Sequence, residues 1–289
     1  MAANDLPVKP FLKWAGGKRQ LLPVIKEHFP KDAVSRTYYE PFVGAGAVLF
    51  GLRPKKAVIN DSNEQLMLTY RTIQDDVESV IKTLKYYQKK HSSKLYYEIR
   101  NWDRDTAVFN ILPDFVKTAR LIYLNKTCFN GLYRVNAKGF FNVPQGRYKN
   151  PAICEEGLLR GISDYLNASD VAILHGDFEQ AVLGADTNSF VYFDPPYHSP
   201  VSTGFTGYQA DGFDEKEHER LRDLMIRLTG MGAKCLLSNA DTEYVRNLYR
   251  HAQFEIIPVQ AKRRINANAA GRGEVGELLV KNWKDQSSS

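Results

Sequence analysis

Residues 189–197 read SFVYFDPPY, a run of apolar residues that ends in an acid, two prolines and a tyrosine. The apolar part predicts a buried strand, so Asp194 is expected at a strand's carboxyl end, where open α/β sheets place their sites. Pro195 and Pro196 fix an extended backbone and remove two amide donors, which leaves nearby carbonyl groups free to accept hydrogen bonds. Asp194 adds a carboxylate and Tyr197 a flat aromatic face. Asp194 to Tyr197 are therefore candidate catalytic residues; the alternative is an ordinary proline-rich turn.

These groups suit chemistry at the exocyclic amine of a nucleic-acid base. Such an amine is a poor nucleophile because its lone pair is delocalised into the ring. Acceptors aimed at its N–H bonds would localise that pair on the nitrogen. An aromatic face would hold a base that has been flipped out of the duplex.

A second motif reads EPFVGAG over residues 40–46. The pattern around it predicts a strand, a glycine turn, a helix over 47–52 and a second strand that ends on Asp61, which is the element order of a nucleotide-binding α/β unit. Glycines let a ligand approach the backbone, and Asp61 is suited to a ribose hydroxyl. A dinucleotide fingerprint would have glycine or alanine where Leu49 stands. The motif therefore favours an adenosine ligand without a pyrophosphate over NAD or FAD.

The N-terminal segment FLKWAGGKR, residues 11–19, contains two glycines before a lysine. A phosphate-binding loop would need Ser or Thr after Lys18, a different glycine spacing and a preceding strand. We expect instead a loop that covers a small ligand, although Trp14 could equally be a core anchor.

The remaining pattern predicts an α/β sheet interrupted by a mainly helical insertion. We expect a catalytic domain formed by residues 1–62 and 166–289 and an insertion formed by residues 63–165. The helical spacing predicts helices over 63–91, 94–105, 114–124 and 214–231. Strands are predicted over 38–43, 56–60, 171–174, 189–193, 233–237, 254–260 and 274–281, and a β-hairpin over 130–143 that turns at 136–139.

Two segments are rich in basic side chains. The predicted hairpin and its flanks interleave Arg, Lys and Asn with aromatic residues, and Arg and Asn read guanine and adenine edges in a major groove that admits a β-ribbon. The second segment reads KRRINAN over residues 262–268. Both would suit a polyanionic partner, as does the net charge of +6. The alternative for each is a solvated surface.

Other features exclude some classes of protein. The three cysteines, Cys128, Cys154 and Cys235, lack metal-ligand spacing, and the histidines show none either. No apolar run has the length of a membrane span and no signal core begins the chain. We therefore expect no metal and no membrane, and a cytoplasmic protein.

Together the motifs resemble the DNA adenine methylase (Dam) family, the alpha-class amino-methyltransferases. The resemblance runs from about Phe11 to Lys281 and is carried by WAGGK at 14–18, residues 40–46, NGL at 130–132, NVP at 142–144, GRY at 146–148 and DPPY at 194–197. It implies a Rossmann-like sheet with one reversed strand near its edge and a target-recognition insertion. It also implies a site-specific enzyme that transfers a methyl group by direct displacement from S-adenosyl-L-methionine to N6 of a flipped adenine.

The resemblance assigns roles to residues of this chain. Asp194, Pro195, Pro196 and Tyr197 would bind the flipped adenine. The expected cofactor contacts are Trp14, Ala15, Gly16, Lys18, Glu40, Phe42, Gly44, Asp61, Asp177, Phe178 and Asp194. The expected DNA contacts are Lys13, Phe129, Asn130, Leu132, Arg134, Asn136, Lys138, Pro144, Arg147, Lys262 and Arg263.

The same resemblance implies double-stranded DNA as the partner, with GATC as the target. Some relatives carry tyrosine where this chain has Phe129, so a contact through the missing hydroxyl is in doubt. A monomer associated with bacterial or phage DNA is expected, and pairing with a restriction endonuclease, a housekeeping role and carriage by a phage stay open.

Three other functions stay open at this point. N4-cytosine methylation uses nearly the same chemistry, although its usual motif begins with Ser. RNA adenine methylation is a second, although duplex RNA offers no readable major groove to the hairpin. The third is a DNA-binding module without catalysis, which would not need to hold S-adenosylmethionine.

Overall fold

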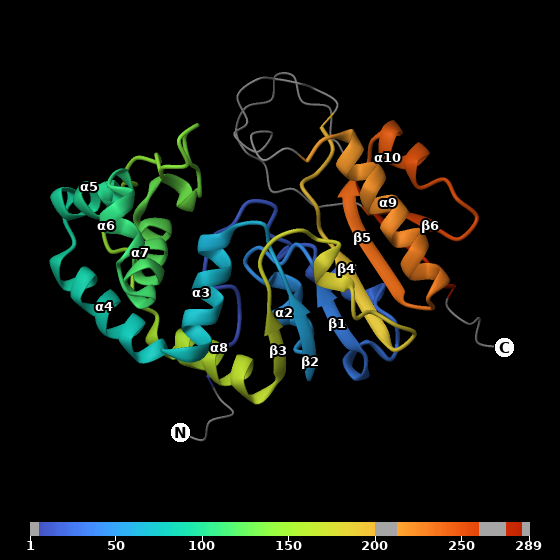
Figure 1. The fold of residues 1–289 in the computed structure, drawn as a ribbon, viewed down its shortest axis with the longest axis horizontal. Coiled ribbons are helices and arrows are strands. Elements are labelled where there is room, and N and C mark those ends of the chain that lie inside the picture. Colours follow the sequence, from blue (N-terminus) through green and yellow to red (C-terminus); the bar gives the residue numbers. More distant parts are fainter. Residues whose placement is uncertain (1–5, 200–212, 260–275, 285–289) are drawn as a thin grey trace.

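A computed structural model describes residues 6–199, 213–259 and 276–284. Within these ranges the chain forms a seven-stranded sheet in the order β3-β2-β1-β4-β5-β7-β6 (Figure 1). The strands are β1 (Thr37–Glu40), β2 (Lys56–Ile59), β3 (Asp170–Ile173), β4 (Ser189–Phe193), β5 (Lys234–Ala240), β6 (Glu255–Val259) and β7 (Glu277–Lys281). The predicted α/β class is confirmed.

The sheet is parallel except for one strand. β3, β2, β1, β4 and β5 run in parallel, whereas β7 is antiparallel to both β5 and β6. This is the reversed strand near the edge that the family resemblance implies. The chain order changes direction between β1 and β4, and such a switch point leaves a crevice at the carboxyl ends of the strands.

The central strand β4 is buried along its whole length, as expected for a parallel strand covered on both faces. Its side chains alternate between two cores. Phe190 and Tyr192 face the core on one side of the sheet, and Val191 and Phe193 face the other. The apolar run that precedes Asp194 therefore anchors this acid at the carboxyl end of the central strand.

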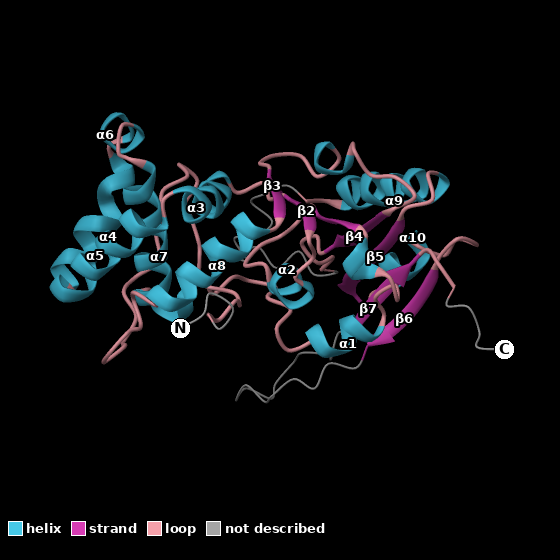
Figure 2. Cartoon of the chain, turned by 90° about the horizontal axis from the view of Figure 1, so that it is seen from below, coloured by secondary structure: helices cyan, strands magenta, loops and turns pink. Residues whose placement is uncertain are grey.

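Helices cover both faces of the sheet (Figure 2). The helices α1 (Leu22–Glu27) and α2 (Ala47–Leu52) lie on one side, and α9 (Glu215–Gly230) lies on the other. The helix α10 (Glu243–Leu248) contributes Val245 to the same core as α9. The predicted positions of α2 and α9 are confirmed, whereas the sequence analysis did not identify α1.

Residues 64–168 form a helical lobe beyond β3, at the opposite end of the molecule from β6 (Figure 1). Its helices are α3 (Glu64–Asp75), α4 (Val77–Lys90), α5 (Ser93–Asn101), α6 (Thr106–Asn110), α7 (Asp114–Thr127) and α8 (Glu156–Ala168). Short 3₁₀ turns are η2 (Ala33–Ser35), η3 (Trp102–Arg104), η4 (Phe129–Gly131) and η5 (Gln180–Val182). None of the described helices is long and apolar enough to cross a membrane.

Two predicted helices of this lobe were wrong in extent. The stretch 63–91 is divided at Asp76, whose φ of −145° is not helical and whose side chain accepts the amide hydrogen of Ser79. This cap ends one helix and starts the next, an option that Asp offers the backbone. The predicted helix 94–105 ends at Asn101 and continues only as a 3₁₀ turn.

The predicted β-hairpin over 130–143 was wrong in one respect, because this segment contains no strands. We call it the hairpin loop. Its turn is present: the amide of Gly139 donates to the Asn136 carbonyl at 2.8 Å and the amide of Asn136 to the Phe140 carbonyl at 2.9 Å. The pairing, however, is a single bridge between Val135 and Phe141. A two-stranded ribbon is marginal by itself, and this one is held by the helical lobe instead.

Candidate active site

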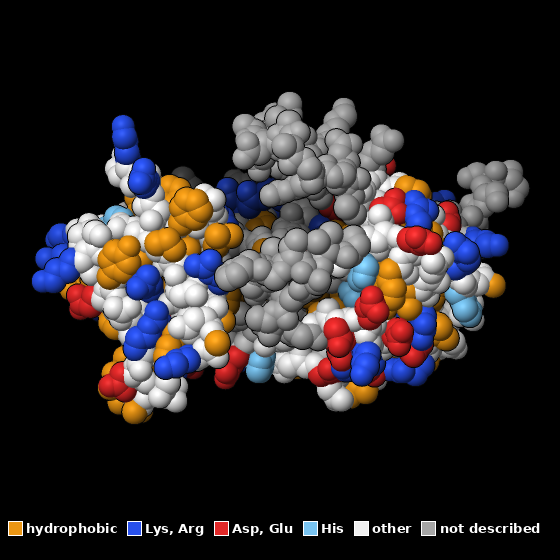
Figure 3. Space-filling view, turned by 90° about the horizontal axis from the view of Figure 1, so that it is seen from above, with side chains coloured by type: hydrophobic (Ala, Val, Ile, Leu, Met, Phe, Trp, Pro, Cys, Tyr) orange, Lys and Arg blue, Asp and Glu red, His pale blue; other side chains and the backbone are white. Residues whose placement is uncertain are grey.

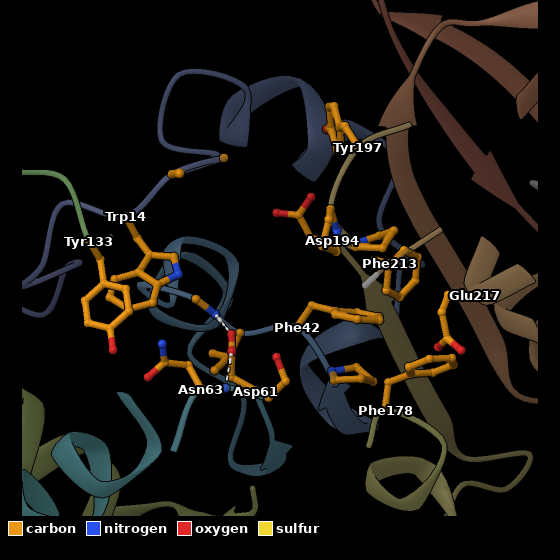
Figure 4. A pocket seen from close by; sticks show the side chains of 18 of the residues that line it. Trp14, Phe42, Asp61, Asn63, Tyr133, Phe178, Asp194, Tyr197, Phe213 and Glu217 are labelled. Atoms are coloured by element: carbon orange, nitrogen blue, oxygen red, sulfur yellow. Dashed lines mark hydrogen bonds between the residues drawn. The ribbon is translucent and has the colours of Figure 1, made fainter. Parts of the chain in front are cut away.

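A cleft of about 1530 Å³ opens at the carboxyl edge of the sheet. Several separate parts of the chain meet there: the N-terminal loop, the segments that follow β1, β2, β3 and β4, the hairpin loop and the start of α9. Figure 4 shows Trp14 and Tyr133 on one wall and Phe42, Phe178 and Phe213 on the opposite wall, with Asp194 near Phe42 and Phe213 and Tyr197 beyond it at the top of the view. Of the predicted cofactor and catalytic residues, all line this cleft: Trp14, Ala15, Gly16, Lys18, Glu40, Phe42, Gly44, Asp61, Asp177, Phe178, Asp194, Pro195, Pro196 and Tyr197.

Lys18 lies at the centre of the predicted catalytic motif. Its Nζ is 2.7 Å from Oδ1 of Asp194 and 4.4 Å from the centre of the Tyr197 ring. It also donates to the carbonyl oxygen of Gly16 at 2.8 Å. A nitrogen with N–H bonds therefore already sits between the carboxylate and the aromatic face.

The Asp194 carboxyl has an altered proton affinity. Burial raises its pKa to about 6, although the neighbouring Lys18 ammonium lowers it, and the charge of Glu277 adds to the rise. The carboxyl is therefore still mostly ionised at neutral pH and able to accept hydrogen bonds.

Tyr197 is held at both ends. Its ring faces the Lys18 ammonium, and its hydroxyl donates to Oε2 of Glu277 at 3.1 Å. Burial, together with the charges of Asp194 and Glu277, raises the pKa of Tyr197 far above its ordinary value. The phenol thus stays protonated and remains a hydrogen-bond donor.

The glycine motif forms the floor of the cleft. Gly44 has a φ of +49°, a conformation that favours glycine. Its amide donates to Oδ2 of Asp61 at 3.0 Å, and Oδ1 of Asp61 accepts the amide hydrogen of Asn63 at 2.9 Å. A Cβ at Gly44 would lie 3.1 Å from Cδ1 of Trp14. The motif therefore orients Asp61 and lets the Trp14 ring lie close to the backbone.

Glu40 is buried beneath this floor. Its carboxylate accepts the hydroxyl of Tyr38 at 2.9 Å. Burial raises the pKa of Glu40 well above its ordinary value, and the nearby Asp194 charge acts in the same direction. Glu40 thus lines the cleft with one oxygen atom already engaged.

Three phenylalanines form one wall of the cleft. The Phe42 ring centre is 5.3 Å from that of Phe178 and 5.6 Å from that of Phe213. Arg220 lies over Phe178 at 4.5 Å, and its Nη2 is 2.5 Å from Oδ2 of Asp177. Phe213 was missed by the sequence analysis because no motif surrounds it; its position just before the Asp214 cap of α9 is the one available signal.

The opposite wall joins the N-terminal loop to the hairpin loop. The rings of Trp14 and Tyr133 stack with centres 5.0 Å apart and planes at 26°. Asn125 on α7 accepts the amide hydrogen of Lys13 at 2.9 Å and donates to the carbonyl oxygens of Lys13 at 2.8 Å and Gly131 at 3.0 Å. Neither Asn125 nor the stack could be read from the sequence, because their partners are far apart along the chain.

The predicted nucleic-acid contacts lie on the surface next to the cleft. Phe129 is 50% exposed and Leu132 is 42% exposed, so both apolar side chains are accessible to a partner. Also exposed are Lys13, Asn130, Arg134, Asn136, Lys138, Pro144 and Arg147. Lys262 and Arg263 lie outside the described residues.

Two side chains of the hairpin loop have bonds within it. Oδ1 of Asn136 accepts the amide hydrogens of Lys138 at 3.0 Å and Phe140 at 3.1 Å. Nε of Arg134 donates to Oδ1 of Asn142 at 2.7 Å. Asn136 thus shapes the turn, whereas Arg134, which also lines the cleft, is held by one bond to the opposite arm.

The space-filling view shows how charge is distributed around these residues. On the face in Figure 3, Lys and Arg outnumber Asp and Glu over the helical lobe, whereas both signs mix near α9. The excess of Lys and Arg over the helical lobe would attract a polyanion to this face of the molecule.

Comparison with known proteins identifies the family. The profile of the D12 class N6 adenine-specific DNA methyltransferases matches residues 14–265. The chain belongs to this family. The methyltransferase is 42% identical over 282 residues to Type II methyltransferase M1.LlaDCHI of Lactococcus lactis subsp. cremoris, and the match covers 97% of each chain.

Two further relatives have similar coverage. Type II methyltransferase M.MjaIII of Methanocaldococcus jannaschii is 43% identical over 295 residues, covering 96% of this methyltransferase and 100% of that protein. The DNA adenine methylase of Vibrio cholerae is 35% identical over 277 residues, covering 93% and 94%. The predicted family and the predicted enzyme class, an adenine-specific DNA methyltransferase, are confirmed. Among the described residues, no three His, Cys, Asp or Glu side chains are grouped to hold a metal ion.

Proposed function

We propose that this methyltransferase uses S-adenosyl-L-methionine to methylate N6 of an adenine flipped out of duplex DNA, within the sequence GATC. The contact of Lys18 with Asp194 and Tyr197 carries the proposal. An amine that pairs with this carboxylate and lies against this ring imitates the exocyclic amine of a stacked adenine. The incoming base would displace Lys18 and take over both contacts.

The cleft also has the features that an adenosine-containing cofactor requires. Phe42 and Phe178 offer aromatic faces, and Asp61 lies at the end of β2, where acids in related sheets bind ribose hydroxyls. The absence of a Cβ at Gly44 lets the Trp14 ring lie against the backbone there, as a further aromatic face of the cleft. When bound, S-adenosylmethionine would supply an electrophilic methyl group, and its product would be S-adenosyl-L-homocysteine. No metal is required for this chemistry.

The residues of the chain would act mainly by positioning and polarisation. Asp194 would accept one N–H of the amine, and the backbone carbonyl groups of the proline pair would offer a second acceptor. These bonds would localise the lone pair on N6. Tyr197 would hold the base by its flat face, so that the nitrogen stays in line with its target.

Exposed residues near the hairpin loop would position the DNA and read its sequence. Phe129 is suited to insertion beside the base that leaves the stack, and Arg134 is suited to a guanine edge. Lys13 and Lys138 would contact phosphates. The choice of GATC rests on the family resemblance of this segment. We further propose that residues 63–165 act as the target-recognition domain of a monomer.

The names of the relatives bear on the biological setting of this methyltransferase. Two of them are named Type II methyltransferases, which favours partnership with a cognate restriction endonuclease. An enzyme that modifies bacterial or phage DNA would act in the cytoplasm.

The test is transfer of labelled methyl groups from S-adenosylmethionine to unmethylated DNA, with products separated by base and by sequence context. We expect N6-methyladenine within GATC. N4-methylcytosine would contradict the choice of base, and methyladenine in another context would contradict the target. Label in RNA alone, or no transfer despite cofactor binding, would overturn the proposal.

A further inference from the structure

Glu277 is the first residue of β7, the antiparallel strand, and no motif of the sequence marks it. In the sheet it lies opposite Ala240 of β5 and Val259 of β6. Its Oε2 accepts the hydroxyl of Tyr197 at 3.1 Å, across 80 residues of chain. The reversed strand therefore contributes a carboxylate to the rear of the catalytic motif.

The Tyr197 ring lies between two charged groups of opposite sign. Lys18 approaches its face at 4.4 Å, and Glu277 binds its hydroxyl. The bond to Glu277 restricts the side-chain torsions of Tyr197 beyond the contact with Lys18. An aromatic ring that must stack on an incoming base works best when its orientation is already set.

Glu277 also acts on Asp194 through its charge. The titratable groups that influence this site are Asp194, Lys18, Glu40, Tyr192, Tyr197 and Glu277. Lys18 lowers the pKa of Asp194, whereas Glu277 raises it. Removal of the Glu277 charge is therefore expected to lower that pKa.

We propose that Glu277 is a positioning residue that fixes the Tyr197 ring for stacking against the target base. The inference rests on the proposed function, because it assumes that Tyr197 holds a base. Glu277 is not among the residues that line the cleft, so it would act through Tyr197.

A double-mutant cycle tests this role. Glu277→Ala and Tyr197→Phe each remove one partner of the same hydrogen bond, so each should lower kcat/KM about tenfold. If Glu277 acts through the hydroxyl, the double variant should be no worse than either single variant. Losses that multiply to about a hundredfold, or a Glu277→Ala variant as active as the wild type, would overturn the inference.

Two matched variants separate positioning from a merely structural role. Glu277→Gln keeps an acceptor for the hydroxyl and should recover part of the activity that Glu277→Ala loses. Glu255→Ala removes an exposed acid that pairs with Lys281 across β6 and β7 at 3.4 Å, and it should leave transfer unchanged. Equal losses in Glu277→Gln and Glu277→Ala, or an equal loss in Glu255→Ala, would count against the proposal.

The charge of Glu277 gives a readout that needs no DNA. The pKa of Asp194 is measured from the ¹³C shift of its carboxyl in protein labelled at aspartate, with Asp194→Asn to assign the signal. We expect a lower pKa in Glu277→Gln than in the wild type, and an unchanged value would contradict the placement of Glu277. If the wild type itself transfers no methyl group to DNA, the proposed function fails, whereas this titration still tests the contact.

Discussion

The carboxyl edge of the sheet and the hairpin loop border the same cleft but are built in opposite ways. At the sheet edge, Lys18 and Glu40 are buried. Lys18 already pairs with Asp194, and Glu40 already accepts a hydrogen bond from Tyr38. In the hairpin loop, residues 134 and 136–139 are exposed, and the strand-like pairing of the two arms is limited to one backbone bridge. Reaction chemistry needs groups fixed in advance, whereas sequence reading needs exposed groups that reach into a groove.

The hairpin loop is nevertheless fixed at its base. The amide of Phe141 donates to Oδ2 of Asp103 at 2.8 Å, and the same carboxylate pairs with Nη2 of Arg120 at 2.8 Å. The carbonyl of Val143 accepts the hydroxyl of Tyr96 at 2.9 Å. A buried ionic network in the helical lobe thus holds an exposed loop, and the difference between the two regions lies in where each is anchored.

The largest expected effect separates the two regions most sharply. Asp194→Ala removes the acceptor that would polarise the amine, so methyl transfer should fall by about 10³-fold or more. DNA binding through the hairpin loop should persist, because Asp194 makes no contact with that loop. Single-turnover transfer and a gel-shift titration on the same DNA measure the two effects.

Folding of the Asp194→Ala variant is checked by circular dichroism and by its urea midpoint. A variant with near-normal turnover would refute the role of Asp194. Equal losses of binding and transfer would show that the two regions are not separable.

The second prediction tests the anchor of the hairpin loop. Asp103→Ala leaves the guanidinium of Arg120, which is 1% exposed, without its charged partner. Breaking a buried ion pair in this way costs about 3–5 kcal/mol in the free energy of unfolding, which urea titration measures. The surface pair of Arg160 and Glu78 is the control, and Glu78→Ala should cost at most about 1 kcal/mol.

Asp103→Asn sharpens this prediction, since an amide oxygen still accepts the Phe141 amide hydrogen. Both variants lose the charge of the carboxylate, but Asp103→Asn should discriminate the target sequence from other sites better than Asp103→Ala does. If Asp103→Ala were as stable as the wild type, the hairpin loop would have to be anchored elsewhere.

The third prediction concerns the exposed residues alone. Arg134→Ala should reduce the preference for GATC over a site with one changed base by about 10- to 100-fold, because a base-reading bidentate contact contributes about 1–3 kcal/mol. Lys138→Ala is the matched control. It should weaken binding to all sequences alike and lower the salt dependence. Competition assays at fixed salt measure both, and a uniform loss in Arg134→Ala would mean that Arg134 contacts only the backbone.

These two regions were also unequally predictable from the sequence. The strand before Asp194 and the helix after Gly46 were predicted with their boundaries, because local apolar pattern and turn residues determine them. The family motifs also brought most of the cleft residues together. No local pattern marks Asn125, Phe213, Glu277 or Asp103, whose partners lie far along the chain. Polar and aromatic residues interleave along the hairpin loop, which is why the sequence predicted a two-stranded ribbon. In the structure, contacts with the helical lobe take the place of the hydrogen bonds between two strands.

The smallest expected effect is a pH dependence that belongs to the sheet edge alone. Burial raises the pKa of Asp194 to about 6, and the ionised carboxylate accepts hydrogen bonds from the amine much more strongly than the protonated carboxyl does. Activity should therefore be on its plateau above pH 7 and fall as the pH drops through 6, reaching about a tenth of the plateau at pH 5. DNA affinity at constant salt should change much less, because the exposed Lys and Arg groups keep their charge over this range. A midpoint near 4, the ordinary value for an aspartate, would mean that the carboxyl is solvated during the reaction; a fall in affinity that parallels the fall in kcat/KM would place the titrating group in the DNA interface instead.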